Sequence, residues 1–498
     1  MTQGDAPHVL LITTDHWPAA LLGCAGHSVI QTPTLDQLAR NGTRFTNAYS
    51  ECPVCIPARR TLMTGCPPRE HGDRTFQVTL PMPEKPTLAQ CFREAGYQAF
   101  AVGKLHVYPQ RDRIGFDDVL LAEEGRPYWG VTDDYEVFLG QRGFAGRQFE
   151  HGMSNNEYLT RTWHLPEDCH VTNWATREMA RMIRRRDPQR PGFWYLSYAH
   201  PHPPLVPLAT YWDMYSGREP DWPLNGAWSD DPARLPYRLQ MQHDGWHCRD
   251  RMEIQRALQA FYALCTHIDH QLRVVLGTLR EEGILDNTIV LFTSDHGDML
   301  GRHGLWAKRL FYEYAANVPM VLMGAKGDRR VQPGTVDDRL VGWQDVMPTL
   351  LGLAGLPVPE SVVGRSMATD AERAFLYGEC LEDAMASRMI RQGQYKLIYY
   401  PAGHHLQLFD VQSDPEELVD LAGHPDMLTM REQLTQRLLG ELYGSDLEWI
   451  RDGALVGLDQ PAHQPQPNRE LSIQRGLHWP PPPVQLEQDP PTAAGGLK

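Results

Sequence analysis

The feature that most constrains this chain is a repeated alternation between short apolar runs and amphipathic stretches over its first two-thirds. The predicted strands are 8–14, 98–103, 193–199, 288–294 and 318–324. The predicted helices are 34–41, 87–96, 173–186 and 252–283. Parallel strands need a long crossover, usually a helix, between them. We therefore expect an α/β fold, with one large mixed, mostly parallel sheet flanked by helices.

The pattern changes after about residue 369. Short strands at 374–377, 395–400 and 406–409 and a late helix at 427–443 predict a small antiparallel sheet with a helix across it. Beyond residue 458 the chain is rich in Pro and Gln, a composition that cannot bury a core and favours an extended arm. The expected organisation is a catalytic domain over 1–369, an α+β subdomain over 370–457 and a Pro-rich tail over 458–498.

Two segments between the predicted strands have a different composition. Residues 111–167 and 205–250 are rich in Gly, Pro, Trp, Tyr and charged side chains, and their periodicity is weak. Long irregular connections of this kind are typical of loops that surround a functional site. We expect both segments to be insertions around such a site.

Charge and composition limit the classes of molecule that this protein is expected to bind. The 498 residues carry a formal net charge of -15, which disfavours nucleic acid and anionic membranes as partners. No apolar run approaches the roughly 20 residues of a membrane span, and the first residues lack the basic and apolar regions of a signal peptide. Nine scattered cysteines do not suggest a disulfide framework. These observations favour the cytoplasm and a small anionic substrate bound by a local cluster of cations.

The segment from Cys52 to Gly65, CPVCIPARRTLMTG, contains the most informative motif. Pro57 suits the first turn of a helix, where a missing N–H has no cost. Cys55 then lies at the N-terminal end of that helix, where free N–H groups and the helix dipole favour an anion. Arg59 follows one turn later, at a spacing that allows it to face the same anion. The segment reads as a nucleophile placed beside an anion-binding site.

Other interpretations of this segment exist. Cys52 and Cys55 form a CxxC pair, which occurs in redox couples and as half of a zinc site. A zinc ribbon needs a second pair at suitable spacing, and the sequence has none. A redox pair normally opens the helix after the first strand of a thioredoxin-like unit, which the flanking pattern does not match. Cys55 as a simple buried thiol is the third interpretation.

Acidic residues directly follow two of the predicted strands. Asp15-His16 comes after the strand at 8–14, and Asp295-His296 comes after the strand at 288–294. The carboxyl ends of parallel strands share one edge of a sheet, where open α/β folds bind ligands. Either acid alone would be interpreted as a helix cap. Together with Cys55 they predict an oxygen-rich metal site.

The run Cys55-Ile56-Pro57-Ala58-Arg59, followed by Thr64-Gly65, resembles the signature of the sulfatase family, within the alkaline phosphatase superfamily. The resemblance extends from residue 8 to about 421. It implies an alkaline phosphatase-like fold, hydrolysis of a sulfuric ester, and oxidation of Cys55 to formylglycine, whose hydrate is the nucleophile. It also implies a partner, the maturation enzyme that makes formylglycine on the unfolded Cys-x-Pro-x-Arg segment.

The resemblance also implies metal ligands at Asp15, residue 55, Asp295 and His296. The commonest sulfatase pattern has Asp-Asp and Asp-Asn at the two strand ends, which suits calcium, whereas this chain has Asp-His at both. Imidazole binds calcium poorly and manganese, zinc or iron well. One divalent ion, Ca²⁺ or Mn²⁺, is expected, and His16 is either a ligand or a neighbour. The second Asp-His pair resembles phosphonate monoester hydrolases and choline-sulfatase-like enzymes, so hydrolysis of phosphonate monoesters or phosphodiesters is the alternative function.

The remaining catalytic candidates match the family's substrate-binding positions. They are Lys104 and His106 after the strand at 98–103, His202 in a Pro-His-x-Pro step, and Lys308 after the second acidic loop. The resemblance implies that Arg59, Lys104 and Lys308 hold the ester oxygens, that His202 with Lys308 protonates the leaving alcohol, and that His106 takes a proton from the formylglycine hydrate. His200 has no such support and is expected to be structural. A homo-oligomer is possible on this sequence.

Overall fold

The computed structural model describes residues 6–125, 132–153, 155–245, 250–369 and 372–463. Its centre is an eight-stranded sheet in the order β4-β3-β5-β1-β6-β7-β2-β8. The strands are β1 (His8–Thr14), β2 (Thr43–Tyr49), β3 (Gln98–Gly103), β4 (Asp118–Leu121), β5 (Gly192–Ser197), β6 (Thr288–Ser294), β7 (Met320–Met323) and β8 (Thr335–Gly342). Only β7 pairs antiparallel with its neighbours. The large, mostly parallel sheet expected from the sequence is confirmed.

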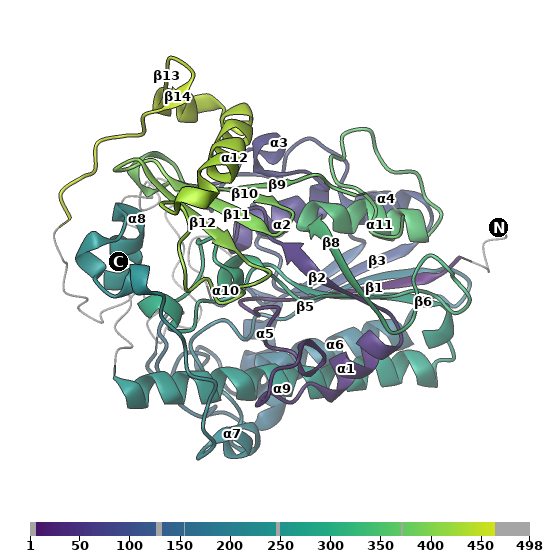
Figure 1. Cartoon of the computed structure of the whole chain (residues 1–498). Coiled ribbons are helices and arrows are strands. Elements are labelled where there is room, and N and C mark those ends of the chain that lie inside the picture. The colour runs from purple at the N-terminus through teal and green to yellow at the C-terminus, as the bar shows by residue number, and fades with distance from the viewer. Residues whose placement is uncertain (1–5, 126–131, 154, 246–249, 370–371, 464–498) are drawn as a thin grey trace.

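Helices cover both faces of this sheet (Figure 1). One face carries α1 (Pro33–Arg40), α6 (Val171–Arg184) and α9 (Arg251–Glu281), and the other carries α2 (Cys55–Thr64), α4 (Leu88–Glu94) and α11 (Val346–Leu353). In β1, Leu10 and Ile12 pack into the first of these layers, and Val9 and Leu11 into the second. Alternate residues of a strand point to opposite faces, so a strand buried on both faces is apolar throughout.

Several local predictions agree with the structure in detail. β1, β3 and β6 have the predicted bounds, and α4 begins after Thr87, whose side chain accepts a hydrogen bond from the Gln90 N–H at 3.1 Å. Gly96 follows that helix with a φ of 91°, the left-handed conformation of a C-terminal stop. By contrast, β7 covers only four residues of the predicted strand 318–324. β2, β4 and β8 lie in segments for which no strand was predicted.

The predicted insertions are more ordered than expected. The first contains β4 and α5 (Asp134–Gln141), and the second contains α7 (Ala209–Tyr215) and α8 (Tyr237–Asp244). Two short helices complete this part of the chain, α3 (Pro68–His71) after α2 and α10 (Glu313–Ala316) before β7. In the part of the chain that the structure describes, no helix is both long and apolar enough to cross a membrane.

A second, antiparallel sheet forms after the large one, in the order β12-β11-β10-β9. Its strands are β9 (Leu376–Cys380), β10 (Ser387–Gln392), β11 (Tyr395–Tyr400) and β12 (His405–Asp410), and α12 (Leu428–Glu441) packs on it through Leu434 and Leu438. The small sheet with a helix across it is therefore present, although its first strand begins two residues later than predicted and β10 was not predicted. Most of the Pro-rich tail, residues 464–498, lies outside the described residues.

Candidate active site

The two acidic strand ends meet at one edge of the large sheet. β1 and β6 are adjacent and parallel, with Thr14 opposite Ser294, so the next residue of each strand, Asp15 and Asp295, leaves the sheet at the same level. The Asp295 N–H donates to the Thr14 carbonyl at 3.1 Å, which fixes this register beyond the strand ends. Both carboxylates are fully buried. The fold therefore brings the two carboxylates close together, as the sequence predicted.

Cys55 reaches the same place from a different element. It is the first residue of α2, preceded by Val54 in an extended conformation, and it is fully buried. Its Sγ lies 3.8 Å from Asp15 Oδ1 and 3.4 Å from His296 Nε2. The N-terminal end of α2 thus points the residue 55 side chain at the two strand-end acids, as the position of Pro57 predicts.

His296 shows how these groups suit a metal ion. Its Nδ1 donates to the Gly297 carbonyl at 2.9 Å, so in the neutral ring the Nε2 lone pair is free to bind a cation. That Nε2 lies 3.3 Å from Asp15 Oδ1 and 3.6 Å from Asp295 Oδ1. Ligand atoms of Asp15, Cys55, Asp295 and His296 all lie within 4.8 Å of one another. Converging lone pairs in a buried place need a positive charge between them, so the donor set fits a divalent metal.

Arg59 contacts this cluster of potential metal ligands through Asp295. Its Nε and Nη2 both lie 3.0 Å from Asp295 Oδ2, and its Nη1 donates to the Lys104 carbonyl at 2.6 Å and to Ser197 Oγ at 2.7 Å. The guanidinium is almost wholly buried. The sequence suggested that Arg59 faces the substrate anion; in the structure Nε donates to Asp295 and Nη1 to the ends of β3 and β5, whereas Nη2 is buried without a hydrogen-bond partner in the described structure.

Lys104 is bound by two carboxylates. It follows β3, and its Nζ makes a very short contact with Asp15 Oδ2 and lies 2.9 Å from Glu124 Oε2. Burial by itself would raise the pKa of Asp15, but Lys104 and Lys308, together with His202 and His296, hold that pKa well below its ordinary value. Asp15 is therefore ionised and available to a cation.

Lys308 joins the nucleophile position to two histidines. Its Nζ lies 2.9 Å from Cys55 Sγ, 2.8 Å from His16 Nε2 and 3.2 Å from His202 Nε2. Burial and Asp15 would raise the pKa of the Cys55 thiol, yet Lys308 and Lys104 help to lower it overall. The site therefore stabilises negative charge on residue 55, which is what a nucleophile needs.

The geometry bears on whether His16 is a metal ligand or only a neighbour, which the sequence left open. Its Nδ1 lies 2.6 Å from Asp298 Oδ2, and a carboxylate accepts there, so in the neutral ring Nε2 is the acceptor that faces Lys308. Nε2 lies 3.7 Å from Asp15 Oδ1. His16 also belongs to a second group of potential ligand atoms with Asp15 and His202. In this second group the Lys308 ammonium lies beside the imidazole rings of both His16 and His202.

His106, a catalytic candidate, and His200, which was expected to be structural, differ in their surroundings. The backbone N–H of His106 donates to Glu123 Oε1 at 3.0 Å, and its ring Nε2 lies 3.7 Å from both Glu123 Oε2 and Glu124 Oε2. Glu124 thereby links His106 to Lys104. His200 Nδ1 donates to the His202 carbonyl at 3.0 Å, so this histidine supports the loop that holds His202.

Two acidic residues of the site had no role in the sequence-based prediction. Glu124 contacts Lys104 and lies 3.4 Å from His202 Nδ1, and its backbone is left-handed, with a φ of 56°. Asp298 binds His16 and accepts from the N–H groups of Leu300 and Ala307. Burial, only partly offset by its hydrogen bonds, raises the pKa of Asp298 to about 6. Asp298 stands within the second acidic motif, a usable signal, whereas Glu124 lies in a predicted insertion without a recognisable pattern.

The described cysteines also bear on the CxxC interpretation. All eight of them are free thiols. Cys52 Sγ lies 3.8 Å from the Arg74 carbonyl, whereas Cys55 Sγ faces Asp15 and His296. Among the groups of potential metal ligands in the described residues, Cys55 is the only cysteine. The two sulfur atoms therefore have different environments, unlike those of a zinc ribbon.

A buried cluster of carboxylates, imidazole and a polarised residue 55, surrounded by cations at the carboxyl edge of an α/β sheet, defines an enzyme that acts on an anionic ester. Comparisons with known proteins agree. The sequence model of the sulfatase family matches residues 7–356, and that of the N-sulphoglucosamine sulphohydrolase C-terminal region matches 301–442. The chain belongs to the sulfatase family and is a sulfuric ester hydrolase.

Individual relatives extend over most of the chain. An arylsulfatase of Clostridium perfringens (strain 13 / Type A) is 32% identical over 469 residues, which cover 90% of this chain and 96% of the relative. A choline-sulfatase of Rhizobium meliloti is 29% identical and covers 85% of this chain and 84% of its own length. The crystal structure of a phosphonate monoester hydrolase of Agrobacterium radiobacter has the same fold, with a TM-score of 0.76 at 23% identity over 87% of this chain and 95% of that one.

Proposed function

We propose that this enzyme hydrolyses a sulfate ester through a formylglycine made from Cys55, with one divalent metal held by Asp15, Asp295, His296 and residue 55. The observation that carries the proposal is the convergence on residue 55. Its Sγ has His296 Nε2 at 3.4 Å on one side and Lys308 Nζ at 2.9 Å on the other. The side chain at this position thus lies between the proposed metal ligands and a cation that can bind an ester oxygen.

The ligand set also bears on which metal is bound. When bound, a divalent ion supplies Lewis-acid stabilisation of the ester oxygens and favours the deprotonated nucleophile. His296 presents an imidazole nitrogen at this place. Imidazole suits manganese and similar ions better than calcium. We therefore propose Mn²⁺ ahead of Ca²⁺.

The cationic side chains of the site have two roles: some stabilise charge on the ester, and others position catalytic groups. Lys104 and Lys308 lie on either side of Asp15 and residue 55, where they stabilise negative charge that develops on the ester oxygens. Arg59 Nε donates to Asp295 Oδ2, and Nη2 lies 3.0 Å from the same oxygen, so we propose that Arg59 positions this carboxylate for the metal. We also propose that His16, fixed by Asp298, orients Lys308 instead of binding the metal.

Proton transfer completes the cycle. With a formylglycine hydrate at residue 55, one hydroxyl, already deprotonated, would attack sulfur, and the S–O bond to the alcohol would break while Lys308 passes a proton by way of His202 to the leaving oxygen. His106, held beside Glu123 and Glu124, removes the proton of the second hydroxyl. The electron pair of that O–H bond forms the aldehyde C=O, and the C–O bond to sulfate breaks. Sulfate leaves and the aldehyde is regenerated without attack of water on sulfur, and addition of one water to the aldehyde restores the hydrate.

A second candidate function follows from the same atoms. The Asp295-His296 pair replaces the Asp-Asn pair of the commonest sulfatase pattern, and a ligand atom of His296 lies within 4.8 Å of ligand atoms of Asp15, Cys55 and Asp295. A nitrogen ligand at this point resembles the sites of phosphonate monoester hydrolases. We propose a phosphonate monoester hydrolase or phosphodiesterase activity as the alternative, or as a side activity of the sulfatase.

The experiment has two parts. Peptide mass spectrometry of protein produced with the maturation enzyme tests for the aldehyde at position 55. Relative kcat/KM values on aryl sulfate, phosphonate monoester and phosphodiester substrates with the same phenol, at fixed metal, then rank the reactions. The proposal predicts the aldehyde, the highest value for the sulfate, and no activity for Cys55→Ala. An unmodified thiol in a fully active enzyme, or a higher value for a phosphorus ester, would overturn it.

A further inference from the structure

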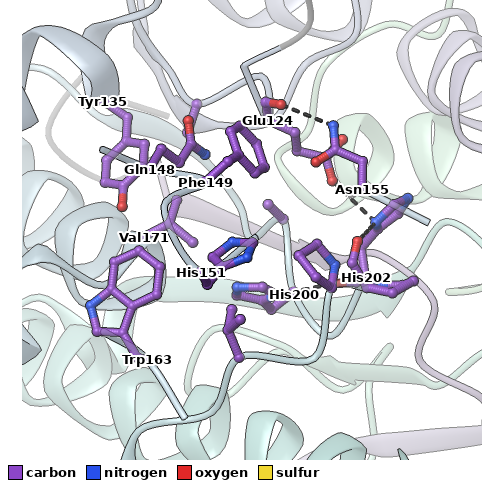
Figure 2. A pocket seen from close by; sticks show the side chains of 15 residues that line it. Glu124, Tyr135, Gln148, Phe149, His151, Asn155, Trp163, Val171, His200 and His202 are labelled. Atoms are coloured by element: carbon purple, nitrogen blue, oxygen red, sulfur yellow. Dashed lines mark hydrogen bonds and ion pairs between the residues drawn. The ribbon is translucent and has the colours of Figure 1, made fainter. Parts of the chain in front are cut away.

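A pocket opens beside the proposed reaction centre. The empty space in it, including open solvent at its mouth, is about 450 Å³. Figure 2 shows Glu124 and His202 at one side of this pocket and Trp163 and Tyr135 at the other, with His151 and His200 between them. It is thus lined by residues of both predicted insertions and of the loop that follows β5.

Two lining residues also contact the catalytic cations. His202 Nε2 lies 3.2 Å from Lys308 Nζ, and Glu124 Oε2 lies 2.9 Å from Lys104 Nζ. In the proposed reaction His202 and Lys308 give a proton to the leaving oxygen. The group attached to that oxygen therefore begins at His202, which is where the pocket begins.

The wall of the pocket has no free cation among the described residues. Of its lining side chains only Glu124 has a formal charge, and Lys104 at 2.9 Å neutralises it. His151 is neutral as well, because burial, with His164 and Arg161, lowers its pKa to about 3. An anionic organic group entering here would lose its water without gaining an opposite charge, which is costly.

The polar atoms of the wall suit hydroxyl groups. His200 Nδ1 donates to the His202 carbonyl at 3.0 Å, so its Nε2 is an acceptor. His151 Nδ1 accepts from the Met153 N–H at 3.1 Å, so its Nε2 is a donor. Gln148 Oε1 is buried without a hydrogen-bond partner in the described structure. A hydroxyl both donates and accepts, and thus satisfies all of these atoms.

The rest of the wall is apolar and largely aromatic. Phe149 lies against His151, with ring centroids 5.7 Å apart, and Trp163 lies on the far side of the pocket (Figure 2). Val171 and Val206 also line this space. Flat aromatic and aliphatic surfaces bind the face of a ring, whose edge can then place its hydroxyl groups against the polar atoms.

We propose that this pocket binds the organic half of the ester as one uncharged ring that bears hydroxyl groups, and that it discriminates against anionic rings. The inference rests on the proposed function, because it places the leaving oxygen at His202. A hydroxylated phenol derivative and a neutral monosaccharide share this chemistry. The experiment therefore has an aryl arm and a sugar arm.

The aryl arm uses phenyl sulfate and three meta-substituted phenyl sulfates bearing hydroxymethyl, carboxymethyl or trimethylammoniomethyl groups. The sugar arm compares a neutral monosaccharide sulfate with the corresponding uronic acid sulfate. The mature holoenzyme is expected to show at least tenfold higher kcat/KM for the neutral hydroxylated member than for the anionic member in one arm or both. An anionic or cationic member equal to or better than the neutral one would overturn the inference.

The variant Gln148→Leu tests whether the polar wall of the pocket recognises hydroxyl groups. Loss of the buried acceptor is expected to lower the ratio of kcat/KM for hydroxymethylphenyl sulfate to that for phenyl sulfate about tenfold, or the equivalent sugar ratio. Gln436→Leu, on the exposed face of α12, is the matched control and should leave this ratio unchanged. An unchanged ratio in a folded Gln148→Leu enzyme would overturn the inference. If mature wild-type enzyme hydrolysed no sulfate ester at all, the proposed function would fail instead.

Discussion

Lys308 Nζ lies 2.9 Å from Cys55 Sγ, although the two residues are 253 positions apart in the chain. The same ammonium reaches His16 Nε2 at 2.8 Å and His202 Nε2 at 3.2 Å. An ammonium has three protons to donate, and each of these acceptors takes one. Lys308 is therefore held in one place, with its charge against the nucleophile position.

Replacing this charge tests its role. Lys308→Met keeps most of the side-chain volume and removes the charge, so kcat/KM on an aryl sulfate should fall about 10²- to 10³-fold, as for the loss of a transition-state donor. Lys326→Met is the matched control, since Lys326 is exposed and pairs with Asp286 at 2.7 Å. Steady-state kinetics with circular dichroism as a check of folding measure the effect. Near-normal activity of the Lys308 variant would contradict the assigned role.

Arg59 offers a test of metal positioning. Its Nε donates to Asp295 Oδ2 at 3.0 Å while its Nη1 donates to the Lys104 carbonyl at 2.6 Å, a planar arrangement of donors that lysine cannot reproduce. Arg59→Lys is therefore expected to weaken metal affinity about 10- to 100-fold, as for other partners of metal ligands. Titration of metal-free protein with Mn²⁺ in a calorimeter measures this directly. Arg330→Lys, whose arginine pairs with Asp328 near the surface, serves as control; equal affinities in both variants would rule out the positioning role.

The burial of Cys55 determines when it can be modified. The residue has no exposed surface, whereas Cys24 and Cys91 are partly exposed. In folded protein made without the maturation enzyme, a thiol reagent should label Cys24 and Cys91 and leave Cys55 unlabelled until denaturant is added. Peptide mass spectrometry gives the extent of labelling at each position. Rapid labelling of Cys55 in native conditions would show that the site is open.

Glu51 provides a pH-dependent test of stability away from the proposed metal ligands. Burial, reinforced by Asp345, raises the pKa of Glu51 from 4.5 to about 7. The folded state thus binds the proton more tightly than the unfolded state, so stability falls as pH rises from 4.5 to 7 and the loss is complete above 7. The shift corresponds to about 3 kcal/mol.

Glu51→Gln removes this titration, together with hydrogen-bond effects that do not depend on pH. The free energy of urea unfolding is measured for both proteins at pH 5 and pH 8. From the lower to the higher pH, that of the wild type should fall by about 2–3 kcal/mol more than that of the variant. Parallel pH profiles would mean that Glu51 ionises normally in the folded protein.

The parts of the site that follow from strand order were predictable. Each of β1 and β6 contains a run of four apolar residues and ends directly before Asp-His, and parallel strands bring such positions to one edge of a sheet. The start of α2 at Cys55 follows from Pro57 two residues later. These local signals suffice because the side chains lie directly at the ends of regular elements.

Other parts depend on tertiary packing. β8 lies at the edge of the sheet and contains the charged run Asp337-Asp338-Arg339, and β2 contains Thr46 and Asn47, so neither has the apolar run of a central strand. The direction of the Arg59 side chain is set by Asp295 and by groups on β3 and β5, which no local pattern encodes. Glu124 lies in an irregular segment, and only the folded chain brings it to Lys104.

The most direct test of the central claim, that residue 55 is the nucleophile, uses Cys55→Ser. A serine hydroxyl in this position can attack sulfur but has no second hydroxyl to expel sulfate, so one equivalent of phenol should be released from an aryl sulfate and turnover should then stop. Peptide mass spectrometry should find the sulfate ester on the residue 55 side chain and nowhere else. Continued turnover, or a sulfate ester on a different residue, would contradict the mechanism.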